Sequence, residues 1–288
     1  MNYKRRDFLK LAGGLAITGL AGKEILSSFK NEEGNFKKFG LQLYTLRDDL
    51  KKGHPREILK LIAAAGYKQI ESYEGPDGIF WGMSPFEFKS LVDELGMKAI
   101  SSHCDINKNF EEKAEQASSI GMKYLICPSI DTQKSADEYK KFAEQFNKCG
   151  SICKKAGIRF AYHNHDHDFK IIDGQVVQDI YMENTDPALV DFEMDIYWVV
   201  TAQNDPVEWL KKYSNRFRLC HIKDRTKGAT ERDASCILGE GSIDYSKILK
   251  VAKENGMKYY IVEQELYNKT TPLKAMVADA RYMKNLRF

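Results

Sequence analysis

The sequence predicts an α/β protein with the (β/α)8 TIM-barrel fold, and a repeated junction is the first observation that supports this. In each copy a helical segment ends at a glycine and a short apolar strand begins within two or three residues. The glycines are Gly66, Gly96, Gly121, Gly157 and Gly256. Glycine just past a helix supplies the left-handed residue that caps it. Amphipathic segments before these glycines and β-branched or aromatic runs after them indicate alternating helices and buried parallel strands.

The second observation is the number of units. Eight strands are expected, at 39–44, 67–72, 97–103, 122–128, 158–163, 189–195, 217–223 and 258–264, each followed by a helical stretch. Eight units in about 265 residues match the usual size of a TIM barrel. An open doubly wound sheet would normally carry a glycine-rich turn after its first strand, and "LQLYTLRDD" has no glycine there. We therefore predict one barrel domain over 36–288, with a small hairpin at 169–180 inserted after the fifth strand and turning at Asp173–Gly174.

The first thirty residues differ in character from the rest. A basic start is followed by an uncharged run from Leu11 to Gly22, which is shorter than the roughly twenty residues that span a bilayer. This run suits a signal-peptide core, and "KRRDFLK" resembles a twin-arginine export signal. Residues 1–30 are thus predicted to form an export signal and linker, which implies a periplasmic protein without a stable membrane anchor. An uncleaved amphipathic helix is the alternative.

Composition limits the classes of partner. Hydrophobic residues make up 43% and charged residues 30% of the chain, and the net charge is only +3. Such a balance gives no long-range field for nucleic acid or an anionic membrane, so neither is an expected partner, and the sequence leaves a homo-oligomer open. The six cysteines contain no CxxC pair, and several lie in apolar runs. They are predicted to be free thiols.

Polar residues gather at the carboxyl ends of the predicted strands, where a TIM barrel carries its chemistry. Five of the six histidines lie at or just after these ends, and acidic residues accompany them. Asp195, His221 and Glu263 come from three consecutive strands and can converge on one divalent cation. In the alternative interpretation, Asp195 and Glu263 pair with Lys223 in a satisfied polar network.

Six stretches resemble a known family: "GLQLYTLRD", "YHNHDHDF", "FEMDIYWV", "HIKD", "GEGSIDYSKIL" and "YIVEQE". From Phe39 onward the chain is similar to the sugar phosphate isomerase/epimerase family, the xylose isomerase-like TIM barrels. The resemblance implies a bound divalent metal and proton transfer next to a sugar carbonyl. It also implies metal ligands from strands 5 to 8, normally a Glu, an Asp, a His and a second Glu. The last three fall on Asp195, His221 and Glu263.

The strand-5 ligand departs from the family pattern. His163 stands where the superfamily has its glutamate. An imidazole can replace a carboxylate as a ligand, but it removes one negative charge, which favours Mn²⁺, Co²⁺ or Zn²⁺ over Mg²⁺. His163 is therefore expected to be a metal ligand and His165 a substrate or proton-transfer residue at the barrel mouth. His167 lies past the strand end and is expected to be exposed.

Further candidates complete the predicted site. Glu71, His103, His165 and Glu263 are candidate proton carriers, and Lys223 could neutralise an oxyanion. Glu71 and Lys223 could instead form an ion pair across the mouth. Trp81 and Trp198 are candidate sugar-stacking residues, although core packing is the commoner role for such rings.

These features predict a metal-dependent isomerase or epimerase that removes a proton next to a carbonyl. The expected substrate is a free sugar, a keto sugar or a polyol, because export and the absence of a glycine-rich phosphate turn argue against a sugar phosphate. A lyase or hydratase acting on 3-keto-glycosides or inosose-like compounds is the nearest alternative. A non-catalytic sugar-binding barrel and a relative of abasic-site endonucleases are the remaining alternatives.

Overall fold

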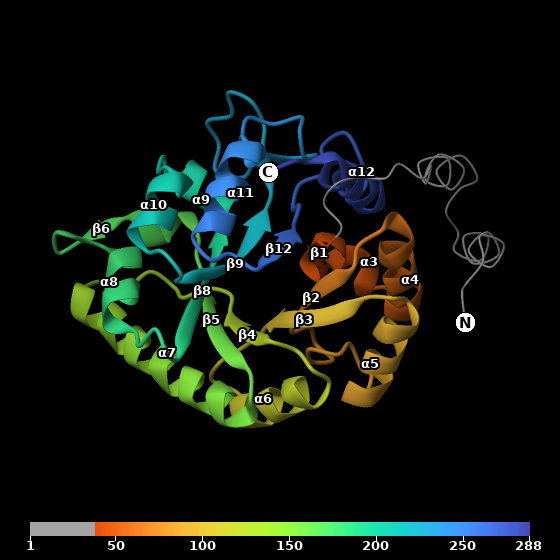
Figure 1. Cartoon of the computed structure of the whole chain (residues 1–288), viewed down its shortest axis with the longest axis horizontal. Helices are drawn as coiled ribbons and strands as arrows, with labels where there is room; N and C mark the ends of the chain where they lie inside the picture. The colour runs from red at the N-terminus through yellow and green to blue at the C-terminus, as the bar shows by residue number, and fades with distance from the viewer. Residues whose placement is uncertain (1–37) are drawn as a thin grey trace.

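The computed structural model describes residues 38–288 and shows eight parallel strands closed into a barrel, with helices around the outside (Figure 1). The strands are β1 (Gly40–Gln42), β2 (Gln69–Tyr73), β3 (Lys98–His103), β4 (Tyr124–Cys127), β5 (Arg159–His163), β8 (Val190–Asp195), β9 (Phe217–Ile222) and β12 (Tyr259–Val262). Their order around the barrel is the order of the chain, and β1 pairs with both β2 and β12 to close it. The predicted TIM barrel is confirmed.

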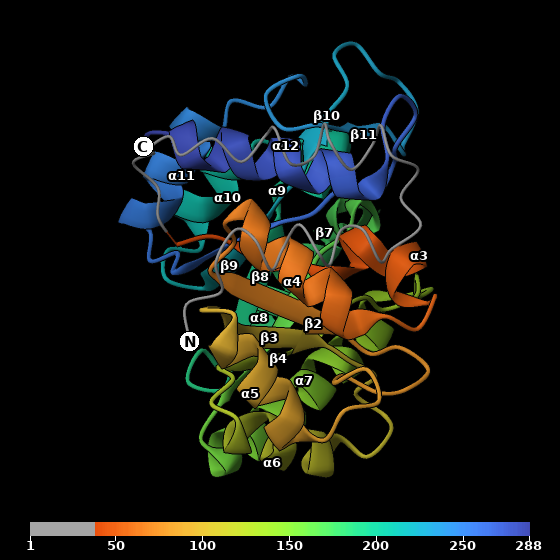
Figure 2. The ribbon, with the colours of Figure 1, turned by 90° about the vertical axis from the view of Figure 1, so that its right-hand side faces the viewer.

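The helices form the outer layer in both views of the ribbon (Figure 2). The short helices at or near the strand ends are η1 (Leu43–Leu46), α3 (Arg47–Leu50), η2 (Asp166–Phe169) and α9 (Ile196–Thr201). The remaining helices are α4 (Pro55–Ala65), α5 (Pro85–Glu94), α6 (Phe110–Ser119), α7 (Ala136–Ala156), α8 (Val177–Asn184), α10 (Pro206–Lys212), α11 (Tyr245–Glu254) and α12 (Pro272–Asn285).

The glycine junctions explain how helix and strand alternate. Gly66 ends α4 with φ +107°, and Gly157 ends α7 with φ +85°. The other three junction glycines also have positive φ. Only glycine adopts this conformation without steric cost, so each junction turns the chain from the helix back into the barrel.

Two small hairpins decorate the barrel. One is β6 (Ile171–Ile172) with β7 (Gln175–Val176), and its turn residues Asp173 and Gly174 both have positive φ, at +50° and +76°. This arrangement matches the predicted hairpin after the fifth strand. The hairpin is shorter than predicted, however, because residues 177–180 begin α8. The second hairpin pairs β10 (Asp224–Arg225) with β11 (Ser235–Cys236).

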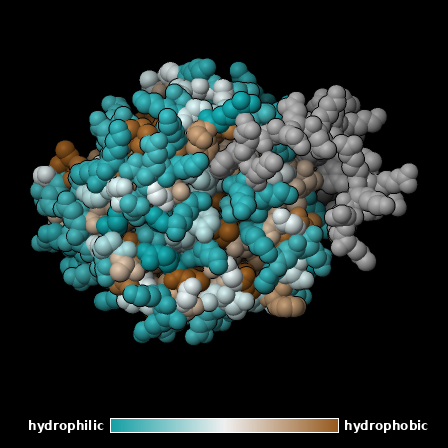
Figure 3. Space-filling view, in the orientation of Figure 1, coloured by the Kyte–Doolittle hydropathy of each residue, from teal (hydrophilic) through white to brown (hydrophobic). Residues whose placement is uncertain are grey.

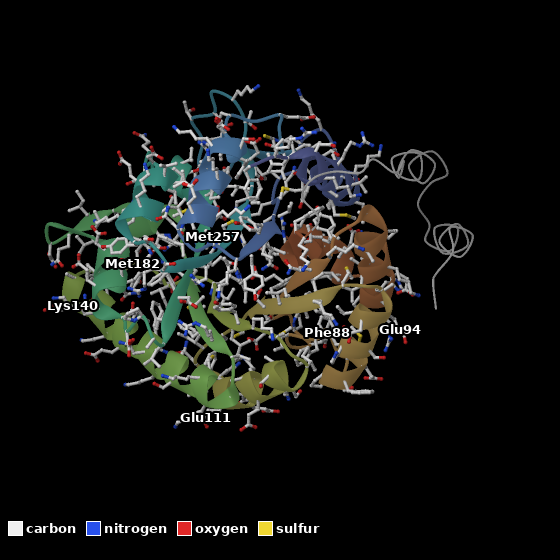
Figure 4. All side chains as sticks on the ribbon, in the orientation of Figure 1. Phe88, Glu94, Glu111, Lys140, Met182 and Met257 are labelled. Atoms are coloured by element: carbon white, nitrogen blue, oxygen red, sulfur yellow. The ribbon has the colours of Figure 1, made fainter. Side chains whose placement is uncertain are left out.

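The apolar core has two parts. The larger part lies between the helices and the outer face of the barrel, where Phe88, Met182 and Met257 are buried (Figure 4). The smaller part fills the barrel interior and consists of Tyr124, Ile126, Ala161 and Leu219, with Tyr259 packed against it. The interior is thus a packed core, and the polar residues of the next subsection follow it along the same strands.

The surface in Figure 3 is largely hydrophilic, with scattered hydrophobic patches. Among residues 38–288, no helix combines the length and apolar character needed to span a membrane. All six cysteines are free, as predicted, and five of them are buried. The predicted export segment lies outside the described residues.

Candidate active site

The alternation of side chains along the strands places polar residues next to the apolar core of the barrel interior, on the side of the carboxyl ends. In β9, Leu219 belongs to the interior core and His221 lies two residues further on; in β5, Ala161 and His163 are related in the same way. Side chains two apart share a face of a strand. Parallel registers bring His163 beside Glu193. The carboxyl ends of the strands therefore present a layer of ionisable side chains inside the barrel.

Three predicted metal ligands converge in an upper cluster formed by Asp195, His221 and Glu263. His221 Nδ1 lies 3.3 Å from Glu263 Oε2 and 3.7 Å from Asp195 Oδ2. All three residues are buried; His221 Nδ1 has no hydrogen-bond partner, and Asp195 Oδ2 is contacted by the Lys223 ammonium at 2.8 Å. A buried polar atom without a partner costs free energy, so His221 Nδ1 indicates a missing group beside it.

Local structure orients Asp195. As the N-cap of α9, it accepts a hydrogen bond at Oδ1 from Trp198 N, which leaves Oδ2 for the upper cluster. The Asn164 side chain clamps the backbone of the same residue, because its amide donates to Asp195 O and its carbonyl accepts from Asp195 N, both at 3.2 Å. The motif "YHNH" therefore supports the carboxylate of "FEMD" across two adjacent strands.

Lys223 lies beside the same carboxylates. Its Nζ is 2.8 Å from Asp195 Oδ2, 3.0 Å from Glu263 Oε2 and 3.2 Å from Glu265 Oε1. Burial would lower the pKa of this lysine, but these carboxylates raise it well above its usual value. Burial would likewise raise the pKa of Glu263, but Lys223 and His221 hold it well below its usual value.

The sequence allows two ion pairings of Lys223: one with Glu71, and one with Asp195 and Glu263. The alternative Glu71–Lys223 ion pair is not formed, because Lys223 pairs with Asp195, Glu263 and Glu265 instead. The alternative in which Lys223 pairs with Asp195 and Glu263 is observed, but it does not satisfy the whole network, because His221 Nδ1 still lacks a partner.

The loop after β9 is tied to the site by two residues that sequence reasoning did not single out. Tyr245 Oη donates to Lys223 O at 2.6 Å and accepts from Lys223 N at 2.9 Å. The Asp224 carboxylate accepts from the backbone N–H groups of residues 239, 241 and 243. These bonds explain why "HIKD" and "GEGSIDYSKIL" occur together.

A lower layer lies behind the upper cluster and consists of Glu71, His103, His163 and Glu193, each with at most 12% of the side chain exposed. His103 Nε2 is 2.7 Å from Glu193 Oε2, and His163 Nδ1 is 3.0 Å from the same oxygen. Glu71 Oε1 is 2.7 Å from His221 Nε2. His163 reaches the upper cluster with its other nitrogen, since Nε2 lies 3.8 Å from Asp195 Oδ2.

The pKa values in the lower layer are shifted in opposite directions. Burial, together with Glu71, raises the pKa of Glu193 to about 7. Burial would lower the pKa of His103, but Glu71 and Glu193 raise it to about 9. Burial and the neighbouring imidazoles hold the pKa of His163 well below its usual value, which keeps that ring neutral. Glu193 was not among the predicted site residues, although its spacing of two from Asp195 places it on the inward face.

The turn after β5 carries the other two histidines. Burial and Lys223 lower the pKa of His165 to about 3, and its buried Nδ1 has no hydrogen-bond partner. His167 is not exposed as expected, because its Nε2 bonds to Ile130 O and 17% of its side chain is accessible. The buried Asp168 carboxylate accepts from His165 N and Tyr162 Oη, which folds this turn inward.

The two candidate stacking tryptophans are both largely buried. Trp198 lies 5.5 Å from the His165 ring, and the Arg232 guanidinium lies over it at 4.1 Å. Trp81 follows β2, packs edge-on against Tyr73 at 4.8 Å, and has an unusual positive φ of +57°. Their assignment to sugar binding stays a prediction.

The upper cluster fits a divalent cation. Ligand atoms that share a metal at roughly 2.0–2.2 Å lie about 3–3.5 Å apart. The spacings of 3.3 and 3.7 Å around His221 Nδ1 are close to that range, and His163 Nε2 approaches from a fourth strand. Two oxygens and two nitrogens form a donor set that suits Mn²⁺, Co²⁺ or Zn²⁺.

Comparison with known proteins finds relatives that share the TIM-barrel family expected from the sequence. The model of the family described as xylose isomerase-like TIM barrel matches residues 59–286. An inosose dehydratase from Clostridium perfringens strain 13 is 30% identical over 304 aligned positions, which cover 98% of this chain and 90% of that protein.

Solved structures show the same architecture. A sugar phosphate isomerase/epimerase from Parabacteroides distasonis is 33% identical with a TM-score of 0.75, and the match covers 88% of this chain and 96% of that one. The IOLI protein, whose crystal structure contains a bound zinc atom, shares the fold with a TM-score of 0.65 at 17% identity, over 85% of this chain and 95% of that one.

Proposed function

The chain belongs to the xylose isomerase-like TIM barrel family, and on that basis we propose that it is a metal-dependent dehydratase of a keto sugar or keto-polyol. The observation that carries the proposal is the convergence of Asp195, His221 and Glu263 around the buried His221 Nδ1, which has no hydrogen-bond partner. A divalent cation held by these residues and His163 would polarise the carbonyl and hydroxyl oxygens of a sugar.

Two of the histidines that adjoin His163, namely His103 and His165, are suited to opposite proton transfers. Ring centroids separate His163 from His103 by 4.9 Å and from His165 by 5.1 Å. At neutral pH, His165 is unprotonated because its pKa is about 3, whereas His103 is protonated because its pKa is about 9. Two groups whose environments push their pKa values apart make an acid–base pair.

We assign the roles accordingly. His165 Nδ1 accepts the proton from the carbon next to the carbonyl. His103 gives a proton through Nδ1 to the hydroxyl that leaves as water, because its Nε2 is already bonded to Glu193. Lys223 keeps Glu263 and Asp195 ionised. Dehydration is favoured over simple isomerisation because the curated relatives are inosose dehydratases.

An isomerase or epimerase is the second candidate, and it is supported by the sugar phosphate isomerase/epimerase at 33% identity. It would use the same proton abstraction without loss of a hydroxyl. A non-phosphorylated substrate is proposed in both cases, since the sequence has no glycine-rich phosphate turn after the first strand.

The test is incubation of the Mn²⁺-loaded protein with an inosose and a 3-keto-glucoside in D₂O. An ultraviolet-absorbing conjugated carbonyl supports the dehydratase. Deuterium at the carbon next to the carbonyl without elimination supports the isomerase. Neither outcome across both substrates rejects the proposal, and metal content lost in Asp195→Ala and His221→Ala but retained in the parent checks the cation site.

Export to the periplasm is a separate proposal based on residues 1–30. Replacing Arg5 and Arg6 together by lysine is expected to retain the protein in the cytoplasm, as measured by cell fractionation. Unchanged periplasmic recovery would contradict it.

A further inference from the structure

Two buried carboxylates lie behind the upper cluster. Glu71 and Glu193 are both fully buried, and each contacts a histidine whose other ring nitrogen faces Asp195 Oδ2. Their place behind the ligands, with no exposed surface, suits them to orienting the ligands rather than touching a substrate.

Hydrogen-bond accounting fixes the role of Glu71. Its Oε1 accepts from the Gln42 amide at 2.9 Å, and its Oε2 accepts from Ser101 Oγ at 2.5 Å. An ionised carboxylate can only accept, so His221 Nε2, 2.7 Å from Glu71 Oε1, must be the donor. With its Nε2 hydrogen held in this way, His221 has Nδ1 left for a cation.

Glu193 stands in the same relation to His163, with the ring nitrogens reversed. Its Oε2 lies 3.0 Å from His163 Nδ1, whereas His163 Nε2 is the atom that faces Asp195. The two residues are direct neighbours in the pairing of β5 with β8. Strand 5 lacks the glutamate of the family pattern, and Glu193 places a carboxylate immediately next to that position.

We propose that Glu71 and Glu193 are positioning residues that hold the hydrogens of His221 Nε2 and His163 Nδ1, and so present the opposite nitrogens to a single divalent cation. The inference rests on the proposed function in that it requires a cation at the upper cluster. Partner carboxylates of this kind orient metal-binding imidazoles and raise their basicity, and their loss typically weakens metal binding 10–100-fold.

Titration calorimetry with Mn²⁺ tests the proposal on the full chain. Glu71→Gln and Glu193→Gln keep the side-chain volume and remove the charge, and each is expected to weaken Mn²⁺ binding by about 10–100-fold. Glu74→Gln is the matched control, because Glu74 follows the same strand but pairs with Lys113 outside the site. The control should bind Mn²⁺ with an affinity within about twofold of the parent, and circular dichroism should confirm that each variant is folded.

A second measurement needs no variant. In protein loaded with ¹¹³Cd²⁺, couplings to ¹⁵N-labelled histidine are expected from His221 Nδ1 and His163 Nε2. Coupling through His221 Nε2 or His163 Nδ1 would overturn the inference. So would a stoichiometry of two cations, because His103, His163, Glu193 and His221 would then form a second metal site.

The two proposals fail differently. A parent protein that binds no divalent cation at all would refute the proposed metal-dependent function and leave the inference without its premise. A parent that binds one cation, with unchanged affinity in folded Glu71→Gln and Glu193→Gln variants, would refute only the inference.

Discussion

Replacing Lys223 by methionine should destabilise the metal-free protein and make it more dependent on a divalent cation. The ammonium lies 2.8–3.2 Å from oxygens of three carboxylates and has no exposed surface. Methionine fills a similar volume and can pack against Trp198, whose ring lies 4.6 Å from Nζ. The substitution therefore removes a charge with little change in packing.

The magnitude follows from burial. Removing one partner of a buried ion pair costs about 3–5 kcal/mol, because the remaining charge stays buried without compensation. For a domain of this size, 1 kcal/mol corresponds to roughly 2–4 °C, so Tm in EDTA should fall by about 6–20 °C. Mn²⁺ should restore part of this loss, and its stabilising effect should exceed that in the parent, since no ammonium repels it.

Thermal denaturation with EDTA and with excess Mn²⁺ measures both effects. Lys212→Met is the control: Lys212 pairs with Asp179 at 2.7 Å, but half of its side chain is exposed, so it should cost less than about 1 kcal/mol and leave the Mn²⁺ effect unchanged. An unchanged Tm for the Lys223 variant in EDTA, or an equal gain from Mn²⁺ in variant and parent, would refute the reasoning.

Three further outcomes are expected elsewhere in the barrel. Burial raises the pKa of Asp279 to about 8, so the stabilising contribution of this carboxyl is full below about pH 4 and is lost as the pH rises through 8. In that window the stability of Asp279→Asn should exceed that of the parent by an amount that grows by up to about 1.4 kcal/mol per pH unit. Urea unfolding at several pH values measures this difference, and a pH-independent difference would contradict the prediction. A methyl at position 241 would overlap the Asp224 carboxylate, so Gly241→Ala should lower the free energy of unfolding by about 1–3 kcal/mol, and parent-like stability would show that the loop can adjust. Asn164→Ala leaves the buried backbone of Asp195 unpaired and should cost about 1–3 kcal/mol and weaken Mn²⁺ binding in calorimetry; unaltered binding would disconnect this clamp from the site.

The barrel could be predicted because the sequence features that specify it are local. A glycine such as Gly157 must be left-handed whatever the rest of the chain does, and repetition of that junction determines the alternation of helix and strand. The convergence of Asp195, His221 and Glu263 was predictable for a related reason. Alternation along a strand and the closure of the barrel place residues at matching depths on one axis.

The sequence could not predict which carboxylate pairs with which cationic side chain. That pairing depends on how far along the barrel axis each side chain lies, and inward-facing neighbours on one strand differ in this by only two residues. Glu71 sits level with His221 and bonds to it, whereas Lys223 lies one step higher and pairs with Glu263. The Glu71–Lys223 pair, one of the two alternatives for these residues, does not form for that reason. Similarly, the inward position of His167 arises from the turn held by Asp168, which no periodicity records.

Charge balance connects these observations to the need for a cation. Four carboxylates are buried together at the barrel mouth: Glu71, Glu193, Asp195 and Glu263. Against these four negative charges stand Lys223 and the protonated His103; burial would lower the pKa of His221, but the nearby carboxylates hold it well above its usual value, so His221 adds a third positive charge in the metal-free protein. A cation bound at His221 Nδ1 would displace that proton, which leaves a formal charge of about −2 when every carboxylate is ionised. An excess of that size inside a protein is costly unless it is neutralised, and one divalent cation at the upper cluster would cancel it.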